Sequence, residues 1–150
     1  MSHFEESRGP WTITTDPARL DVEAIYHYLS ASYWAKNRSR ESVERSLKNS
    51  FCFGLYDAGK QIGLARVISD FATFAYLCDV YVLDAYQGKG LGTWLLRSVM
   101  SHPDLQNLRR WILATRDAHR LYRKSGFTEL QTPERWMEIL TSPPAAETRS

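Results

Sequence analysis

The stretch YQGKGLGTWLL, residues 86–96, places three glycines at alternate positions directly before an apolar run with helical spacing. Gly88, Gly90 and Gly92 would allow an anion to approach the backbone, and the first N–H groups of a helix attract negative charge. The same turn could instead be a tight strand-to-helix connection in which glycine only relieves steric strain. By itself the stretch therefore does not decide whether a phosphate binds, or which one.

The spacing of the glycines argues against two nucleotide-binding motifs. A Walker A loop requires Gly-x-x-x-x-Gly-Lys-Ser/Thr, whereas Lys89 lies between glycines here. The dinucleotide fingerprint requires Gly-x-Gly-x-x-Gly in a first βαβ unit. In this chain the glycines alternate, and about 85 residues precede them.

The sequence on both sides of the turn predicts a mixed α/β domain. Apolar or alternating runs predict strands at residues 11–16, in a hairpin over 51–69, and at 74–83, 109–115, 127–130 and 135–140. Helical spacing and capping residues predict four helices, which start at Asp16-Pro17, cover 42–47, run from Leu91 to Pro103, and run from Asp117 to Gly126. The strands before and after the third helix form a crossover unit, so they should be parallel neighbours.

The composition is that of one folded domain. Of 150 residues, 43% are hydrophobic and 13% aromatic, which suffices for a sizeable core. We expect a single domain over residues 1–140 and a disordered tail over 141–150, where paired prolines occur. The net charge of +2 is too small to make nucleic acid or an anionic membrane the expected partner. No apolar run approaches the roughly 20 residues of a membrane span, and the first ten residues do not resemble a secretory signal.

The cysteines and histidines point to no metal. Cys52 and Cys78 both lie in apolar runs, which favours buried thiols over a disulfide or a metal site. The four histidines show no spacing that recurs in zinc motifs. A reducing, cytoplasmic location is the simplest expectation.

Two motifs together resemble one known family. The segment Gln87–Gly92 resembles the Gln/Arg-x-x-Gly-x-Gly/Ala motif of the GNAT superfamily of acetyl-CoA-dependent N-acetyltransferases. Downstream, AHRLYRKSGF (residues 118–127) resembles its second signature, Ala-x-x-Leu-Tyr-x-x-x-Gly-Phe. The order of predicted elements from Trp11 to Leu140 also follows the family. The resemblance implies a central mixed β-sheet of six to seven strands, flanked by about four helices.

The resemblance implies that acetyl-CoA is the acyl donor. The pyrophosphate would bind to the backbone of the glycine turn, at Gln87, Gly88, Lys89, Gly90, Leu91, Gly92 and Thr93, with Lys89 as an added charge. The pantetheine arm would pair with the preceding strand at Val80, Tyr81 and Val82. The N–H of Val80 would polarise the thioester carbonyl.

The resemblance also implies the catalytic residues. Tyr122 matches the tyrosine that protonates the departing thiolate in many members, although it could also be a core tyrosine. Asp79 is the only carboxylate in its strand. It could deprotonate the amine, hold the ammonium group, or be a structural aspartate. Tyr76 lies where some members carry a glutamate, so water could relay the proton to the base.

The acceptor side carries less information. The first two helices and their connection cover the acceptor in this fold, so Tyr33, Trp34, Arg38 and Tyr76 are candidate substrate-binding residues. Aromatic packing beside an exposed arginine explains the first three equally well. Many members have asparagine where Thr115 stands, which puts that cofactor contact in doubt. A basic run could attract the 3′-phosphate or could be a solvated helix face; it consists of Arg116, Arg120, Arg123 and Lys124.

We therefore expect an enzyme that moves acetyl from acetyl-CoA to a primary amine of a small molecule or peptide, by direct attack in a ternary complex. A covalent acetyl-Cys78 route is the disfavoured variant. A non-catalytic CoA-binding sensor or interaction module is the alternative on the same fold, and an unrelated phosphate-binding protein is a third. A homodimer is left open.

Overall fold

The apolar runs of the sequence form strands that pair in the order in which they occur along the chain. The computed structural model describes residues 3–141. Its six-stranded sheet has the order β1-β2-β3-β4-β5-β6, and only β5 and β6 are parallel. The strands are β1 Glu5–Arg8, β2 Trp11–Thr14, β3 Phe51–Asp57, β4 Lys60–Ser69, β5 Phe74–Val82 and β6 Arg110–Ile112. The predicted mixed sheet and the parallel crossover are thereby confirmed.

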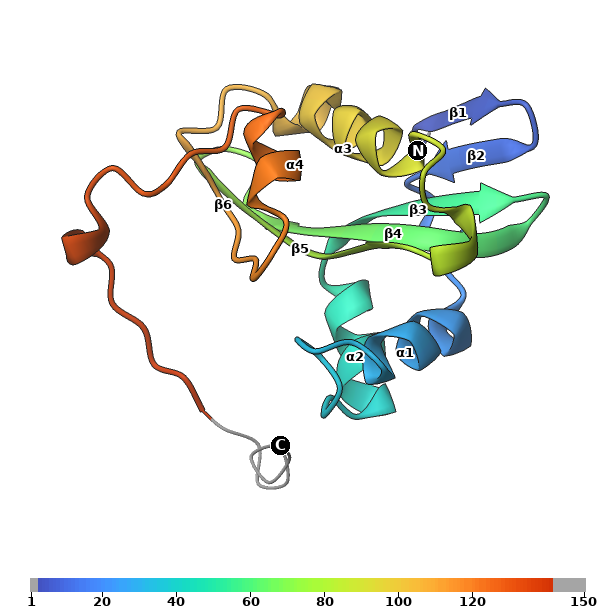
Figure 1. Cartoon of the computed structure of the whole chain (residues 1–150), viewed down its shortest axis with the longest axis horizontal. Helices are drawn as coiled ribbons and strands as arrows, with labels where there is room; N and C mark the ends of the chain where they lie inside the picture. Colours follow the sequence, from blue (N-terminus) through green and yellow to red (C-terminus); the bar gives the residue numbers. More distant parts are fainter. Residues whose placement is uncertain (1–2, 142–150) are drawn as a thin grey trace.

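The four α-helices cover both faces of this sheet (Figure 1). On one face lie α1 (Val22–Ser30) and α2 (Arg40–Lys48), and on the other lie α3 (Leu91–Ser101) and α4 (His119–Arg123). Four short 3-10 turns complete the structure: η1 Pro17–Arg19, η2 Asp84–Tyr86, η3 Pro103–Leu105 and η4 Pro133–Arg135. Within the described residues, no helix is both long and apolar enough to cross a bilayer.

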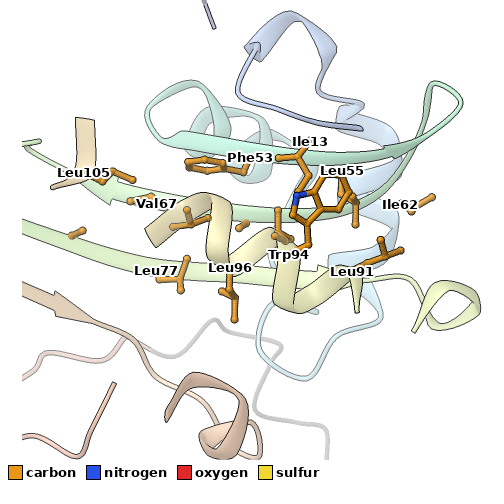
Figure 2. Close-up of a cluster of buried hydrophobic side chains, with 14 residues drawn as sticks. Ile13, Phe53, Leu55, Ile62, Val67, Leu77, Leu91, Trp94, Leu96 and Leu105 are labelled. Atoms are coloured by element: carbon orange, nitrogen blue, oxygen red, sulfur yellow. The ribbon is translucent and has the colours of Figure 1, made fainter. Parts of the chain in front are cut away.

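The main core lies between the sheet and α3. Trp94, Leu95 and Val99 on α3 are fully or almost fully buried, in the same core cluster as Phe53 and Leu55 of β3. Figure 2 shows Trp94 next to Leu55. Trp94 and Leu95 are adjacent in the sequence and Val99 follows Leu95 by four residues, so all three lie on one side of the helix. This packing fixes the start of α3, and with it the glycine turn, against the sheet.

A bulge in β5 changes which side chains face each layer. Leu64 pairs with Tyr81 while Arg66 pairs with Cys78, so β5 has one extra residue between these pairs. Asp79, in the bulge, has a φ of 51°, which is rare for a residue other than glycine. Such a bulge locally disrupts the ladder and bends the strand.

The alternation of β5 shifts at the bulge. Before it, Ala75 and Leu77 belong to the core that contains α3. After it, Val80 and Val82 pack against that core, and Tyr81 belongs to the second core with α1 and α2. β5 is therefore covered on both faces only after the bulge; before it, Tyr76 and Cys78 are half-buried and line a cavity, so the prediction of a strand covered on both faces holds for only part of its length.

Several predicted boundaries are wrong. Asp16 caps only the 3-10 turn η1, and the cap of α1 is Asp21, whose Oδ1 accepts from the N–H of Ala24. The last helix starts after Ala118, so Asp117 is not its cap. The first strand, β1, was not predicted, because its four residues are polar and exposed and show no apolar alternation.

The two predicted closing strands are also wrong. Residues 127–130 and 136–140 form no strand in the described structure, and 133–135 are a 3-10 turn. Met137, Ile139 and Leu140 are 95%, 96% and 80% exposed. The segment has the composition of a strand, but it pairs with none of the described strands. Apart from Thr141, the tail predicted to be disordered lies outside the described residues.

Candidate active site

The candidate site lies where β5 and β6 separate. Their parallel pairing extends only from Phe74 opposite Arg110 to Tyr76 opposite Ile112. From Leu77 onward, β5 pairs with β4 alone among the described strands. The other edge of this half of β5 is therefore available to an extended ligand, as an unpaired strand edge is in general.

A cavity of about 380 Å³ opens at this separation. Its walls are β5, the segment after β6, α4 and the connection between α1 and α2. Each residue predicted for catalysis or acceptor binding lines it: Tyr33, Trp34, Arg38, Tyr76, Asp79 and Tyr122. Val80 lines it as well. Residues separated by up to 89 positions in the sequence thus meet around one space.

Asp79 accepts hydrogen bonds from three side chains. Its Oδ1 accepts from Trp34 Nε1 at 2.7 Å, and its Oδ2 accepts from Arg38 Nη1 and from Arg66 Nε, both at 2.8 Å. The carboxylate is almost completely buried. Burial by itself would raise its pKa, but the hydrogen bonds and charges of Arg38 and Arg66 outweigh burial and hold the pKa below its usual value. Asp79 is therefore ionised and held by three donors, and its lowered pKa makes it a weak proton acceptor.

Arg66 is the one member of this cluster that the sequence analysis missed. Its Nη1 donates to Ser50 Oγ at 2.9 Å, and its side chain is only 9% exposed. A signal was present, because an arginine in the middle of the apolar strand QIGLARVIS needs a buried partner. Asp79 on the neighbouring strand is that partner.

Tyr122 lies on α4 and lines the same cavity as Asp79, which lies on β5. Its ring packs edge-on against Phe127, with centroids 6.0 Å apart. Burial, and to a smaller degree the neighbouring Tyr33, raises the pKa of Tyr122 to about 12. Its hydroxyl therefore keeps its proton at neutral pH.

Tyr33 connects the α1–α2 connection to the opposite wall. Its hydroxyl accepts from the backbone N–H of Arg116 at 3.1 Å, and the guanidinium of Arg116 lies 3.8 Å from the centre of its ring. Arg116 lines the cavity, whereas Arg120 and Lys124 of the same basic run do not. Thr115 shapes this wall, because its Oγ1 accepts from the N–H of Ala118.

The glycine turn lies directly before α3, as its sequence predicted. Gly88 and Gly90 have φ angles of 81° and 79°, which favour glycine. The N-cap of α3 is Gly90, so no side chain bonds to the first N–H groups of the helix. Gln87 donates from its side chain to the carbonyl of Val82 and so ties the turn to the end of β5.

The remaining residues predicted for donor binding differ in what they expose. Lys89 and Thr93 are exposed, whereas the side chain of Leu91 is buried in the main core. Tyr81 points to the other face of the sheet, where its ring stacks on Tyr28 at 3.8 Å. Only the backbone of Leu91 and Tyr81 is therefore available to a ligand. From Thr93, a groove of about 290 Å³ runs between α3 and α4.

Both cysteines are free; Cys52 is buried, as predicted, whereas Cys78 is only half-buried. Burial is the largest influence on the Cys78 thiol and raises its pKa to about 11, although Arg66 acts in the opposite direction. Among residues 3–141 no group of three or more His, Cys, Asp or Glu side chains is placed to hold a metal ion.

Comparison with known proteins gives consistent matches. The profile of the Acetyltransferase (GNAT) family matches residues 22–127. The candidate acetyltransferase FG08082 of Gibberella zeae is 36% identical, over 79% of each chain. A solved candidate GNAT acetyltransferase of Xanthomonas campestris pv. campestris is 46% identical, with a TM-score of 0.86, and the match covers 87% of this chain and 93% of that one. A GNAT-family acetyltransferase of Elizabethkingia anophelis, solved with acetyl-CoA bound, shares the fold at 17% identity, with a TM-score of 0.63 and 90% of each chain covered.

Proposed function

Because this chain belongs to the GNAT family of acetyltransferases, we propose that it transfers the acetyl group of acetyl-CoA to a primary amine of a small molecule or peptide. The amine attacks directly in a ternary complex. The observation that carries the proposal is the cavity that Val80 and Tyr122 line together. Acyl transfer from a thioester needs a donor for the carbonyl oxygen and a donor for the leaving sulfur, and these residues supply an N–H and a hydroxyl.

The donor fits the surface beside the cavity. We assign its pyrophosphate to the backbone N–H groups of the turn from Gln87 to Thr93. Support comes from the left-handed Gly88 and Gly90, which have open space where a side chain would point, and from the uncapped start of α3. The pantetheine arm is assigned to the free edge of β5 at Val80–Val82, where it can bond as an added strand.

The reaction balances without a covalent enzyme intermediate. The amine nitrogen attacks the thioester carbon, the N–C bond forms, and the C–S bond breaks. The N–H of Val80 stabilises the negative charge that develops on the carbonyl oxygen. The nitrogen loses one proton and the sulfur gains one, so the products are the acetylated amine and CoA.

Tyr122 is the proposed proton donor to the sulfur. Its raised pKa keeps the hydroxyl protonated before the reaction. A thiol, with an ordinary pKa of roughly 8.5, is a stronger acid than this tyrosine, so proton transfer from Tyr122 to the sulfur is unfavourable by itself. It becomes favourable when Tyr122 receives a proton from the attacking nitrogen in place of the one that it gives. Tyr122 thus acts as a relay between nitrogen and sulfur.

The first deprotonation of the acceptor is assigned to water. The sequence suggested Asp79 as a base, an ammonium ligand or a structural residue, and its three hydrogen bonds and lowered pKa support the structural role. We propose that Asp79 holds Trp34 and Arg38 at the acceptor end of the cavity. An amine with an ordinary pKa of roughly 10 then loses its proton to solvent before it attacks.

The test combines binding and turnover. Calorimetry with acetyl-CoA should give 1:1 binding, and incubation with a panel of amino acids, polyamines, aminoglycosides and peptides should give an N-acetyl product by mass spectrometry. Acetyl-CoA binding without any acetylated product would support the CoA-binding module instead. Tighter binding of ATP or NAD than of CoA would contradict both.

A further inference from the structure

The charges around the candidate acceptor site do not cancel. Arg38 and Arg66 share the single carboxylate of Asp79, which leaves one net positive charge in a mostly buried cluster. The other charges that line the cavity, Arg116 and Asp117, lie 3.8 Å apart, both about two-thirds exposed, so they offset each other. The excess positive charge therefore belongs to the Arg38–Asp79–Arg66 cluster.

The two arginines of the cluster differ in what they offer to a ligand. Arg66 is 9% exposed and donates to both Asp79 and Ser50, so it is a structural residue. Arg38 is 31% exposed, lines the cavity, and uses one guanidinium nitrogen, Nη1, in its bond to Asp79. Its other N–H groups are the ones that a ligand in the cavity can reach.

From this charge arrangement we propose that the acceptor amine also carries a carboxylate, which binds Arg38; this inference rests on the proposed acetyl transfer. The planar guanidinium suits a carboxylate, because it can donate two parallel hydrogen bonds. A purely cationic acceptor, such as a polyamine, would meet a net positive cluster, and both carboxylates that line the cavity are already paired. The same positive charge favours the neutral form of the attacking amine.

The test uses amines that differ only in the acidic group. Phenylalanine, phenylalaninamide and phenethylamine are compared, and so are β-alanine and β-alaninamide, by N-acetyl product formation at saturating acetyl-CoA. The acids should exceed their neutral partners by at least tenfold in kcat/KM. Arg38→Met and the charge-retaining Arg38→Lys should both reduce this preference. The control Arg45→Met, at an exposed site on α2, should preserve it.

A preference for the amide or the simple amine would overturn the acidic acceptor and leave the acetyltransferase proposal intact. If acetyl-CoA binds and nothing in the panel is acetylated, the proposed function fails instead. Calorimetric titration of the CoA-loaded protein with each acid and amide then tests whether the cavity prefers a ligand that carries a carboxylate. Tighter binding of the acid that depends on Arg38 supports it, and equal binding of the two contradicts it.

A second inference comes from the other end of the molecule. The strand-like segment Trp136–Leu140 (residues 136–140) starts beside β6, where the guanidinium of Arg110 lies 4.7 Å from the ring centre of Trp136. In Figure 1 the segment after η4 lies clear of the sheet and the helices. Three of its large apolar side chains are 80–96% exposed, a degree that a solvated surface seldom shows for neighbouring residues.

The unpaired edge of β6, with the apolar hollows beside it, offers a surface on which such a segment could pair. β6 pairs with β5 on one side, and no other described strand pairs with it. Beside it are two hollows of about 460 and 540 Å³, whose apolar lining residues include Trp111, Leu113, Phe127 and Leu130. Arg109 and Arg110 lie at this edge, while Glu134, Arg135 and Glu138 lie at or beside the exposed segment, which gives it one net negative charge opposite the two arginines.

We infer that two copies of this chain exchange residues 136–140, each segment adding a strand to the free edge of the partner's β6. Each copy supplies one segment and one edge, so a two-fold symmetric pair satisfies both features twice. A fold-back onto its own β6 would require the chain to reverse direction directly after Trp136, whereas the segment leads away from that edge.

The test measures both assembly and exchange. Light scattering after size exclusion should give the mass of a dimer for the full chain. Met137→Asp with Ile139→Asp should give a monomer, and Ser42→Asp with Ser101→Asp, at exposed sites on α2 and α3, should stay dimeric. A wild-type monomer at 100 µM, or a dimer that survives the first double variant, would overturn the inference.

Exchange is distinguished from other dimers by cross-linking. In a background with Cys52→Ala and Cys78→Ala, one batch carries Ile112→Cys and another carries Ile139→Cys. Mixing, brief unfolding and refolding should let a short bismaleimide join one chain of each kind. A third protein carries both Ile112→Cys and Ile139→Cys in one chain. If the reagent joins the two cysteines only within this chain, and never joins the two batches, the segment folds back onto its own β6, which would contradict the exchange.

Discussion

The indole N–H of Trp34 donates to the carboxylate of Asp79 at 2.7 Å, across 45 residues of sequence. With Arg38, this bond ties the connection between α1 and α2 to the bulge of β5. The connection itself contains turns and no regular helix or strand. Its position over the cavity is set by these side-chain bonds together with the burial of Ala35 in the second core.

Asp79→Asn should lower the free energy of unfolding by about 3 kcal/mol, since it leaves the buried Arg66 without its counter-charge. Urea unfolding at pH 7 measures the change. Asp117→Asn, at an exposed pair, should change it by less than about 0.5 kcal/mol. A similar loss in both variants would contradict the special role of Asp79.

The pH dependence of stability gives a separate test of the same carboxylate. The folded pKa of Asp79 is lowered, so its contribution is present above the unfolded pKa of roughly 3.9 and is lost as pH falls toward the folded value. The difference in unfolding free energy between wild type and Asp79→Asn should be constant from pH 7 to pH 5 and shrink below pH 4. A difference that grows on acidification would have the wrong sign.

Tyr122→Phe should reduce kcat at least tenfold, on the order of a general-acid contribution, with little change in the Kd of acetyl-CoA. Because the pKa of Tyr122 is about 12, the wild-type rate should rise with pH up to pH 10 without a descending limb from this residue. The rise reports loss of the proton from the acceptor. Tyr26→Phe, on α1 outside the cavity, is the matched control and should retain the wild-type rate.

Cys78→Ala should retain the rate within about twofold. The pKa of the Cys78 thiol lies near 11, so the thiolate that a covalent route requires is scarce at neutral pH. Intact-mass measurement after incubation with acetyl-CoA alone should find no acetylated protein. An acetyl-enzyme that disappears in the alanine variant would replace direct transfer by a two-step route.

Gly90→Ala should raise the Kd of acetyl-CoA by tenfold or more. Alanine at a φ of 79° is strained by about 1–2 kcal/mol, and relief of that strain would rotate the N–H groups at the start of α3. Gly9→Ala is the matched control, because Gly9 also has a positive φ and open space at its Cβ but lies between β1 and β2. If the two variants lose similar stability but only Gly90→Ala loses affinity for acetyl-CoA, the assignment of the pyrophosphate to this turn is supported. Equal affinities of the two variants for acetyl-CoA would contradict it.

The sequence predicted those parts of the fold that local patterns determine. The hairpin of β3 and β4, the crossover through α3 and the glycine turn directly before that helix all follow from residues that are close together in the chain. The cavity residues could be named only through the family resemblance, because no local pattern brings Tyr33 near Tyr122. The structure places them around one space.

What the sequence did not predict depends on tertiary context. The role of Asp79 follows from Arg66 and Trp34, which lie on other elements, and a single aspartate in an apolar strand does not reveal its partners. β1 is polar throughout and forms because β2 offers an edge. Residues 135–140 have the pattern of a strand, but a strand also requires a neighbour to pair with.

The loop at residues 31–39 has a consequence for how this protein could acquire new specificity. It meets the rest of the domain through a few side chains, chiefly Trp34 and Arg38 at Asp79, Tyr33 at Arg116, and Ala35 in the second core. The glycine turn and the free edge of β5, assigned to the donor, lie in a later stretch of the chain. Substitutions in a segment of nine residues could therefore redirect the choice of acceptor while donor recognition is inherited unchanged, so the two specificities can evolve separately.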